Sequence, residues 1–82
     1  MTDSNRANGP DRDDLETARR AAAAHTAASR DVEAFLRRVP EVPGPAELAE
    51  YATLIAREEE LRAQRLDAAD AAGLTAPSIE SP

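Results

Sequence analysis

The sequence predicts an all-α protein that folds as one antiparallel, coiled-coil-like hairpin of two helices. Residues 13–39 and 45–73 each carry apolar or small side chains at helical spacing, with no proline or glycine inside before the final glycine. Pro40, Pro43 and Pro45 mark the short connection, residues 40–44. A short, stiff connection favours two helices that lie antiparallel and side by side.

The first helix is expected over residues 13–39. Asp13 suits the N-cap position, and Glu16 stands three residues later, as in a capping box. Apolar or small residues then alternate at steps of three and four, which defines a heptad seam. The seam consists of Leu15, Ala18, Ala22, His25, Ser29, Val32, Leu36 and Val39, and it is widened on one side by Ala21, Ala28 and Phe35.

The second helix is expected over residues 45–73. Pro45 suits the first helical position, Glu47 falls in the first turn, and Gly73 is a plausible stop. The half nearest the connection has a clear apolar face, made by Leu48, Tyr51, Ala52, Leu54 and Ile55. In the other half Glu58, Arg62 and Arg65 occupy the same sector, and apolar Leu61 and Leu66 flank them.

The ends of the chain differ in composition from the helices. Residues 1–12 contain almost nothing to bury and include the breaker pair Gly9-Pro10. Residues 74–82 form a short tail with two prolines and one isolated large apolar residue after Leu74, Ile79. Both segments are expected to be disordered or flexible.

Folding the hairpin at its connection predicts which residues face each other. In an antiparallel pair the numbers of facing residues add up to a constant, here roughly 84. Leu36 then lies near Leu48, and His25 lies near Glu58. Ala22 falls near Arg62, and Ala18 falls near Arg65. The half nearest the connection is thus expected to be a self-sufficient core, and the terminal half, which pairs alanines with charges, a place for a partner.

Composition narrows the classes of function. The chain has 82 residues, a net charge of −6, no cysteine, and arginine as its only basic residue type besides one histidine. An acidic chain is a poor match for nucleic-acid phosphates or for anionic membranes. Without cysteine there are no disulfides or thiolate metal sites. The longest apolar run, residues 21–24, is too short to span a bilayer, and no secretion signal is visible, so a cytoplasmic location is expected.

His25, Ser29 and Glu58 are the residues closest to a catalytic pattern. His25 and Ser29 are four residues apart and therefore neighbours on one helix face, and Glu58 faces them in the predicted register. Such a set consists of a nucleophile, here Ser29, a base, here His25, and a carboxylate that orients the base, here Glu58. The favoured interpretation is instead a polar layer that fixes the register of the helices. Whether this layer also responds to pH is left open.

The acidic residues offer no convincing metal site, and no cofactor is expected. Glu58, Glu59 and Glu60 point in directions about 100° apart around a helix, so they do not chelate one ion together. The pairs Glu47 with Glu50 and Asp67 with Asp70 supply only two carboxylates each. These acidic residues are instead interpreted as parts of solvent-exposed helix faces.

The leading hypothesis is a non-enzymatic protein–protein interaction module, such as an accessory subunit, regulator or assembly factor. Its partner is a second copy, giving a four-helix bundle, or a larger protein. The interface candidates are His25, Ser29, Tyr51, Glu58, Leu61, Arg62, Arg65 and Leu66.

Two alternatives are kept. One is a small all-helical enzyme with a site between protomers, where His25, Glu58, Arg62 and Arg65 supply the charged groups. The other, ranked third, is a nucleic-acid-binding regulator, a class that the net charge disfavours. Thermal stabilisation by an anionic metabolite would support the enzyme, and salt-sensitive binding to duplex DNA would support the regulator.

Overall fold

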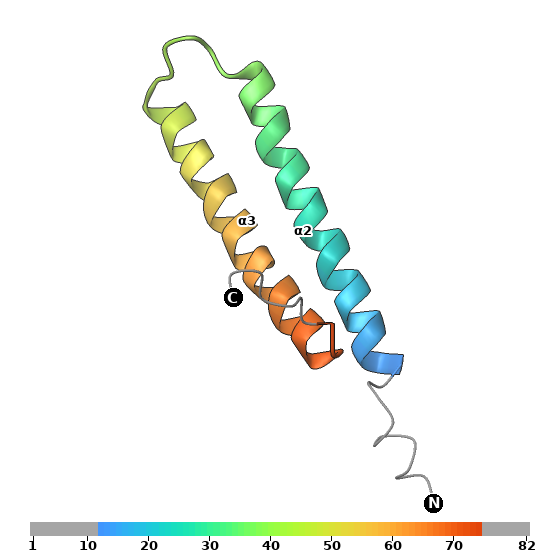
Figure 1. Cartoon of the computed structure of the whole chain (residues 1–82). Helices are drawn as coiled ribbons and strands as arrows, with labels where there is room; N and C mark the ends of the chain where they lie inside the picture. The colour runs from blue at the N-terminus through green and yellow to red at the C-terminus, as the bar shows by residue number, and fades with distance from the viewer. Residues whose placement is uncertain (1–11, 75–82) are drawn as a thin grey trace, which may run out of the picture.

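The protein is a hairpin of two antiparallel helices that pack against each other along their length (Figure 1). The computed structural model describes residues 12–74. Helix α2 spans Arg12–Arg38 and helix α3 spans Pro45–Ala71. The predicted helical hairpin is therefore confirmed, with helix ends that differ from the expected ones by one or two residues. The terminal segments expected to be disordered, 1–12 and 74–82, lie almost entirely outside the described residues.

Helix α2 differs from the prediction at its start. Arg12, the first described residue, is already helical, and Asp13 lies in the first turn. Asp13 is therefore not an N-cap with Glu16 as its partner, as the capping-box pattern suggested. Its carboxylate, like that of Asp14, stands where the positive end of the helix dipole favours an anion.

Helix α2 ends where the prolines require it to end. Arg37 and Arg38 occupy the last turn, where cations suit the dipole. The amide of Val39 still donates to the carbonyl of Phe35, at 2.9 Å. Pro40 follows, and because it lacks an amide hydrogen it cannot continue the ladder. The chain then crosses to α3 through residues 39–44.

Helix α3 begins as predicted, with Pro45 at the first helical position and Glu47 in the first turn. Gly44 is the N-cap and has extended backbone geometry. A glycine has no side chain to cap the helix, so the cap consists of the Glu47 carboxylate, whose Oε1 accepts the Gly44 amide hydrogen at 2.7 Å. This contact satisfies a backbone donor at the point where the chain turns.

Helix α3 ends at Ala71, and Gly73 follows as the stop that the sequence indicated. Gly73 has a φ of 77°, in the left-handed region that glycine adopts at little cost. The amide of Leu74 donates to the carbonyl of Ala69 at 2.8 Å, and the amide of Gly73 donates to Asp70 at 3.0 Å. Those two bonds form a Schellman motif, which closes the helix and satisfies its last carbonyls.

The contact between the helices includes the predicted seam, but its most deeply buried residues on α2 lie in the row beside the seam. Among residues 12–74, only Ala28, Phe35 and Ala72 are buried. Ala28 and Phe35 are seven residues apart on α2 and belong to the row that was expected only to widen the seam. The seam residues next to them, Ser29 and Leu36, are turned partly toward solvent. Phe35 is thus the only large side chain that is buried in the described part of the chain.

The expectation of a self-sufficient core near the connection is wrong. Leu36 is 54% exposed, Leu48 59% and Tyr51 38%. In the terminal half Leu66 is also largely exposed, as expected, while the small residues Ala28 and Ala72 are buried. Two helices alone offer each apolar side chain only one neighbouring surface, which explains why these leucines remain uncovered.

Substitution of Phe35 tests which row of α2 faces inward. We expect Phe35→Ala to lower the free energy of unfolding by about 3–5 kcal/mol, because Phe35 is the only large side chain buried within residues 12–74. Leu36→Ala, at the next position but half exposed, should cost less than about 1 kcal/mol in dilute solution. Urea denaturation followed by circular dichroism measures both. A larger loss for Leu36→Ala would contradict the observed packing.

Substitution of Glu47 tests the cap of α3. Glu47→Ala should lower the free energy of unfolding by about 0.5–1 kcal/mol, because the Gly44 amide loses its acceptor. Glu47→Gln keeps an acceptor oxygen and should retain most of the stability. Equal losses in the two variants, measured by thermal denaturation, would show that the cap contact is not what Glu47 contributes.

Candidate functional site

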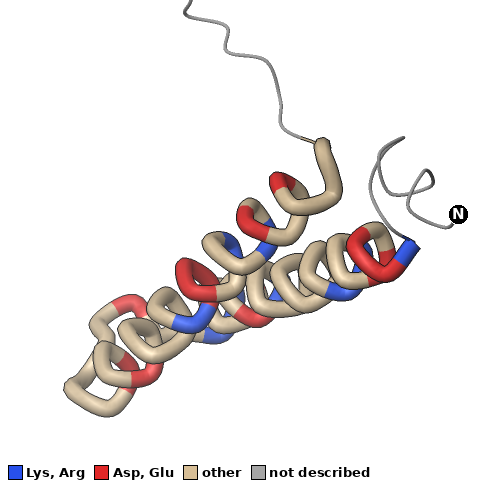
Figure 2. The backbone as a smooth tube through the Cα atoms, turned by 90° about the horizontal axis from the view of Figure 1, so that it is seen from below, with Lys and Arg blue, Asp and Glu red and all other residues tan. Residues whose placement is uncertain are grey.

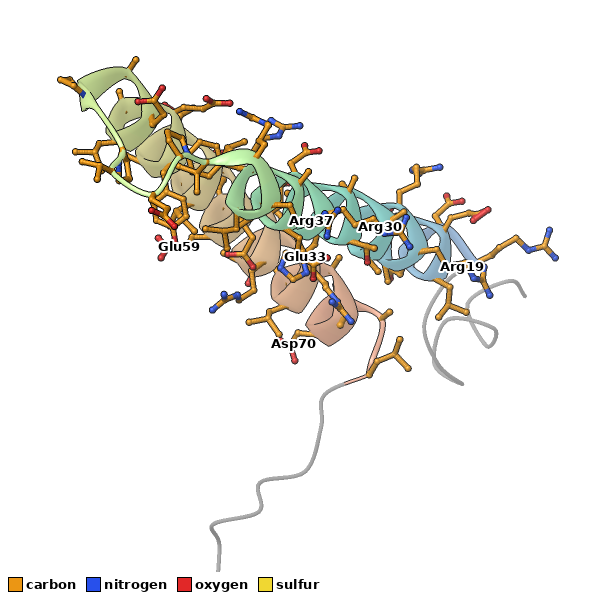
Figure 3. All side chains as sticks on the ribbon, turned by 90° about the horizontal axis from the view of Figure 1, so that it is seen from above. Arg19, Arg30, Glu33, Arg37, Glu59 and Asp70 are labelled. Atoms are coloured by element: carbon orange, nitrogen blue, oxygen red, sulfur yellow. The ribbon has the colours of Figure 1, made fainter. Side chains whose placement is uncertain are left out.

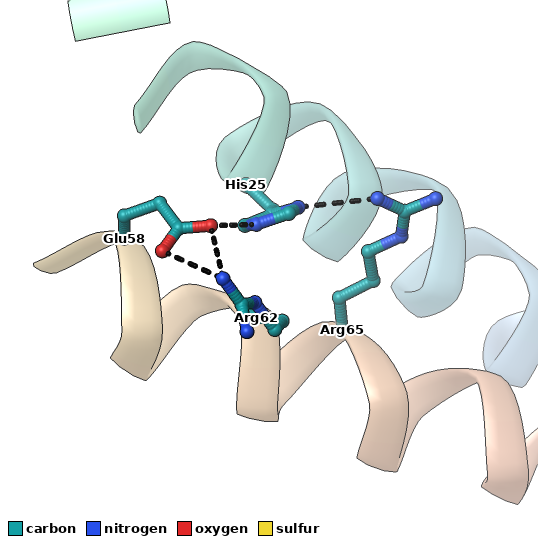
Figure 4. Close-up of polar contacts among 4 residues, drawn as sticks. All are labelled: His25, Glu58, Arg62 and Arg65. Atoms are coloured by element: carbon teal, nitrogen blue, oxygen red, sulfur yellow. Dashed lines mark hydrogen bonds and ion pairs between the residues drawn. The ribbon is translucent and has the colours of Figure 1, made fainter. Parts of the chain in front are cut away.

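The main polar cluster of the hairpin joins the two helices near their middle (Figure 4). It contains His25 from α2 and Glu58, Arg62 and Arg65 from α3. Glu58, Arg62 and Arg65 recur at steps of four and three residues, so they lie on one face of α3. The predicted contact of His25 with Glu58 is confirmed. Arg62 and Arg65, which were predicted to lie near Ala22 and Ala18, direct their guanidinium groups to Glu58 and His25.

The two ring nitrogens of His25 contact partners of opposite charge. Nε2 lies 2.7 Å from Glu58 Oε2, and Nδ1 lies 3.1 Å from Arg65 Nη1. A guanidinium only donates hydrogen bonds and a carboxylate only accepts them. The geometry therefore assigns a neutral ring whose Nε2–H donates to Glu58 and whose Nδ1 accepts from Arg65. His25 connects a cation and an anion of α3 through one ring on α2.

Glu58, the carboxylate of this cluster, has two partners, His25 and Arg62. Arg62 Nη2 donates to both of its oxygens, at 3.2 Å and 3.1 Å, one helical turn away on α3. The side chains of His25 and Glu58 are each only 13% exposed, while that of Arg62 is 57% exposed. The hydrogen bond from His25, and then those from Arg62, hold the pKa of the Glu58 carboxyl below its usual range.

The nucleophile set considered for His25, Ser29 and Glu58 is not assembled in this geometry. Both nitrogens of His25 are already occupied by charged partners. Ser29 is half-buried one turn from His25, and within residues 12–74 its hydroxyl makes no side-chain hydrogen bond to either residue. What the arrangement does chemically is to satisfy a partly buried carboxylate and a histidine between two helices.

The other interface candidates lie outside this cluster. Leu61 is half-buried on α3, and Leu66 is exposed. Tyr51 is near the connection, where its ring stacks on that of Phe35 with centroids 5.7 Å apart. The structure therefore brings together four of the eight candidates and places Ser29 beside them.

A second cross-helix contact was not predicted. Arg38 of α2 pairs with Glu50 of α3, and its guanidinium lies 5.0 Å from the centre of the Phe35 ring. The hydrogen bond with Glu50 raises the pKa of Arg38. Its position next to the connection, with glutamates in the first turns of the next helix, was the available signal for the pair.

A shallow apolar pocket lies at the connection end of the hairpin. Its volume is about 150 Å³. It is lined by Phe35, Leu36, Val39, Pro43, Glu47, Leu48 and Tyr51. Six of these seven residues are apolar or aromatic, and three of them are the exposed Leu36, Leu48 and Tyr51. The pocket gathers solvent-exposed apolar side chains at this end of the hairpin.

Two further searches concern metals and membranes. Across residues 12–74, no group of three or more histidine or acidic side chains is arranged to hold a metal ion. Neither α2 nor α3 is long and apolar enough to cross a membrane.

Known proteins offer no guide to the cluster or to the pocket. No protein-family model, curated protein or solved structure gives a significant match to this chain. The class that the fold defines is therefore a helical hairpin, and its function has to be argued from its own surface.

The lowered pKa of Glu58 predicts a pH dependence. A carboxyl whose folded pKa is depressed stabilises the fold above its unfolded pKa, near ~4.3, and this contribution is lost as the pH falls through the folded pKa. Glu58→Gln should therefore melt below the natural protein at pH 7, and the gap should narrow at pH 3. Glu60→Gln, exposed two residues along, is the matched control for carboxylate loss. A gap that stays constant between the two pH values would contradict this role of Glu58.

Proposed function

We propose that this protein is a non-enzymatic interaction module, which acts by packing exposed helix faces onto a second copy of itself or onto a larger protein. The observation that supports the proposal is that more large apolar side chains are exposed than are buried. Phe35 is the only large side chain buried within residues 12–74, while Leu36, Leu48 and Leu66 are all more than half exposed. Apolar surface left open on so small a core is typical of chains that complete their fold by association.

The polar cluster supports this function without adding chemistry. His25, Glu58 and Arg65 satisfy one another across the two helices. A paired polar layer of this kind sets the relative height of two helices, because a shift by one turn would leave its partly buried carboxylate unpaired. The hairpin then presents its exposed leucines in a fixed arrangement, which a binding surface requires.

The charge pattern favours protein partners. Arginines and acidic residues are interspersed along both helices (Figure 2). The whole chain carries a net charge of −6. Such a surface attracts a basic or mixed protein surface more than a phosphate backbone. The finer form of the proposal is a four-helix bundle made from two hairpins.

The test compares binding by the natural protein with binding by Leu48→Glu, which alters an exposed side chain and leaves Phe35 in place. We expect the natural chain to elute from a sizing column with light scattering as a complex, either with itself or with a protein captured from its host. Leu48→Glu should lose at least about tenfold in affinity, since a charge would enter an apolar contact. Glu60→Gln is the control that should bind normally.

A folded natural chain that stays monomeric and captures no protein would contradict the proposal. Thermal stabilisation by an anionic small molecule, abolished in Arg62→Ala but not in Arg57→Ala, would instead support an enzyme with a site between protomers. Circular dichroism confirms in each case that the variants keep the helix content of the natural chain.

A further inference from the structure

Helix α2 presents two parallel rows of small or apolar side chains, and the hairpin buries one of them more deeply than the other. Residues seven apart fall on the same face of a helix, so each row follows that spacing. The inner row consists of Ala21, Ala28 and Phe35. The outer row, about 100° further round the helix, consists of Leu15, Ala22, Ser29 and Leu36. Ala28 and Phe35 are buried, whereas Leu36 is 54% exposed.

Helix α3 presents a matching row on the same side of the hairpin. Leu48 and Ile55 are seven residues apart, and Leu66 follows three turns later. Leu36 and Leu48 line the same pocket, which places the two outer rows beside each other. We call this surface the apolar face. It is defined by Leu15, Ala22 and Leu36 on α2 and by Leu48, Ile55 and Leu66 on α3.

The two edges of the apolar face differ in charge. Arg30 and Arg37 each follow a residue of the outer row on α2, so they stand along its edge, with Glu33 between them (Figure 3). Glu59 stands four residues after Ile55, along the edge of the row on α3 (Figure 3). Near the middle of the hairpin the edge on α2 therefore carries two arginines and one glutamate. On α3, Glu59 stands at the edge, while the exposed Arg62, seven residues after Ile55, continues the row and is paired with Glu58.

From these charges we infer that the partner of the apolar face is a second copy of this chain, with both connections at the same end of the dimer. The inference rests on the proposed function as an interaction module. A two-fold axis along the hairpin places α2 of one copy over α3 of the other, so the edge with two arginines meets the edge with Glu59. A two-fold axis across the hairpin places α2 over α2 and α3 over α3, so like charges meet.

The positions of Arg30 and Glu59 along the hairpin axis also bear on this arrangement. Within one chain, Arg38 of α2 reaches Glu50 of α3. Arg30 is eight residues before Arg38, and Glu59 is nine residues after Glu50, in helices that run in opposite directions. Counted from this pair, Arg30 and Glu59 differ in height by one residue; counted from the contact of His25 with Glu58, Arg30 lies six residues, or roughly 9 Å, nearer the connection. In the dimer, the long side chain of Arg30 of each copy therefore has to reach along the helix toward Glu59 of the other, and the symmetric interface contains this pair twice.

A charge swap tests the pairing. Arg30→Glu alone and Glu59→Arg alone should each raise the Kd of the dimer about tenfold, because each creates two repulsive contacts. The double variant, Arg30→Glu with Glu59→Arg, should return to within about threefold of the natural Kd. Sedimentation velocity over a concentration series measures all four proteins. A double variant as weak as the two single variants would overturn the pairing.

Matched controls separate the pairing from a general effect of charge. Arg20→Glu makes the same reversal away from the apolar face on α2, and Glu60→Arg does so on α3. Both should leave the Kd within about twofold of the natural value. If they weaken the dimer as much as Arg30→Glu and Glu59→Arg do, the apolar face is not the interface.

The positions of the connections test the direction of the axis. The chain has no cysteine, so Val42→Cys, which lies in the connection and is 85% exposed, gives one unique site for a spin label. Connections at the same end should place the two labels about 10–25 Å apart, as neighbouring helices lie. Helices of 27 residues are roughly 40 Å long, so opposed hairpins would give about 40 Å or more. The longer distance would overturn the inferred arrangement.

The experiments distinguish failure of the inferred dimer from failure of the proposed function as an interaction module. A natural chain that is monomeric, yet binds a host protein in a way that Leu48→Glu abolishes, would refute the second copy as partner and leave the interaction module standing. A chain that neither dimerises nor binds a protein would refute both.

Discussion

The contact made by Phe35 is the interaction on which the rest of the hairpin depends. Its ring is buried between the helices, stacks on Tyr51 of α3, and lies under the guanidinium of Arg38, which in turn pairs with Glu50. One aromatic side chain thus packs on α3 directly and also lies against an arginine of its own helix that is ion-paired to α3. Elsewhere the buried residues are alanines, which let the helices approach closely but remove little apolar area from water.

The polar cluster complements this anchor. A single apolar contact at one end fixes the distance between the helices there, but it does not resist sliding along the rest of their length. His25, Glu58 and Arg65 supply directional bonds near the middle, and their geometry is satisfied only in one register. The hairpin therefore has apolar packing near its connection and hydrogen-bonded alignment further along.

The sequence predicted the helices, the connection, the start of α3, the Gly73 stop and the contact of His25 with Glu58, because these follow from proline, glycine and antiparallel geometry. It did not predict which row of α2 faces inward. Adjacent rows differ by one residue and about 100° of rotation, and alanines allow either row to pack closely. The pair of Arg38 and Glu50 was also missed, since long flexible side chains reach beyond the residues that face them in the backbone register.

The connection at residues 39–44 has a further consequence for how the chain reaches its fold. Contacts between the helices are nested around it, with Phe35 and Tyr51 close in sequence and His25 and Glu58 much further apart. Loop-closure entropy grows with the length of chain enclosed, so the pair near the connection closes at the lower cost. We therefore expect the aromatic pair to meet first during folding and the polar layer to join once the intervening turns have formed.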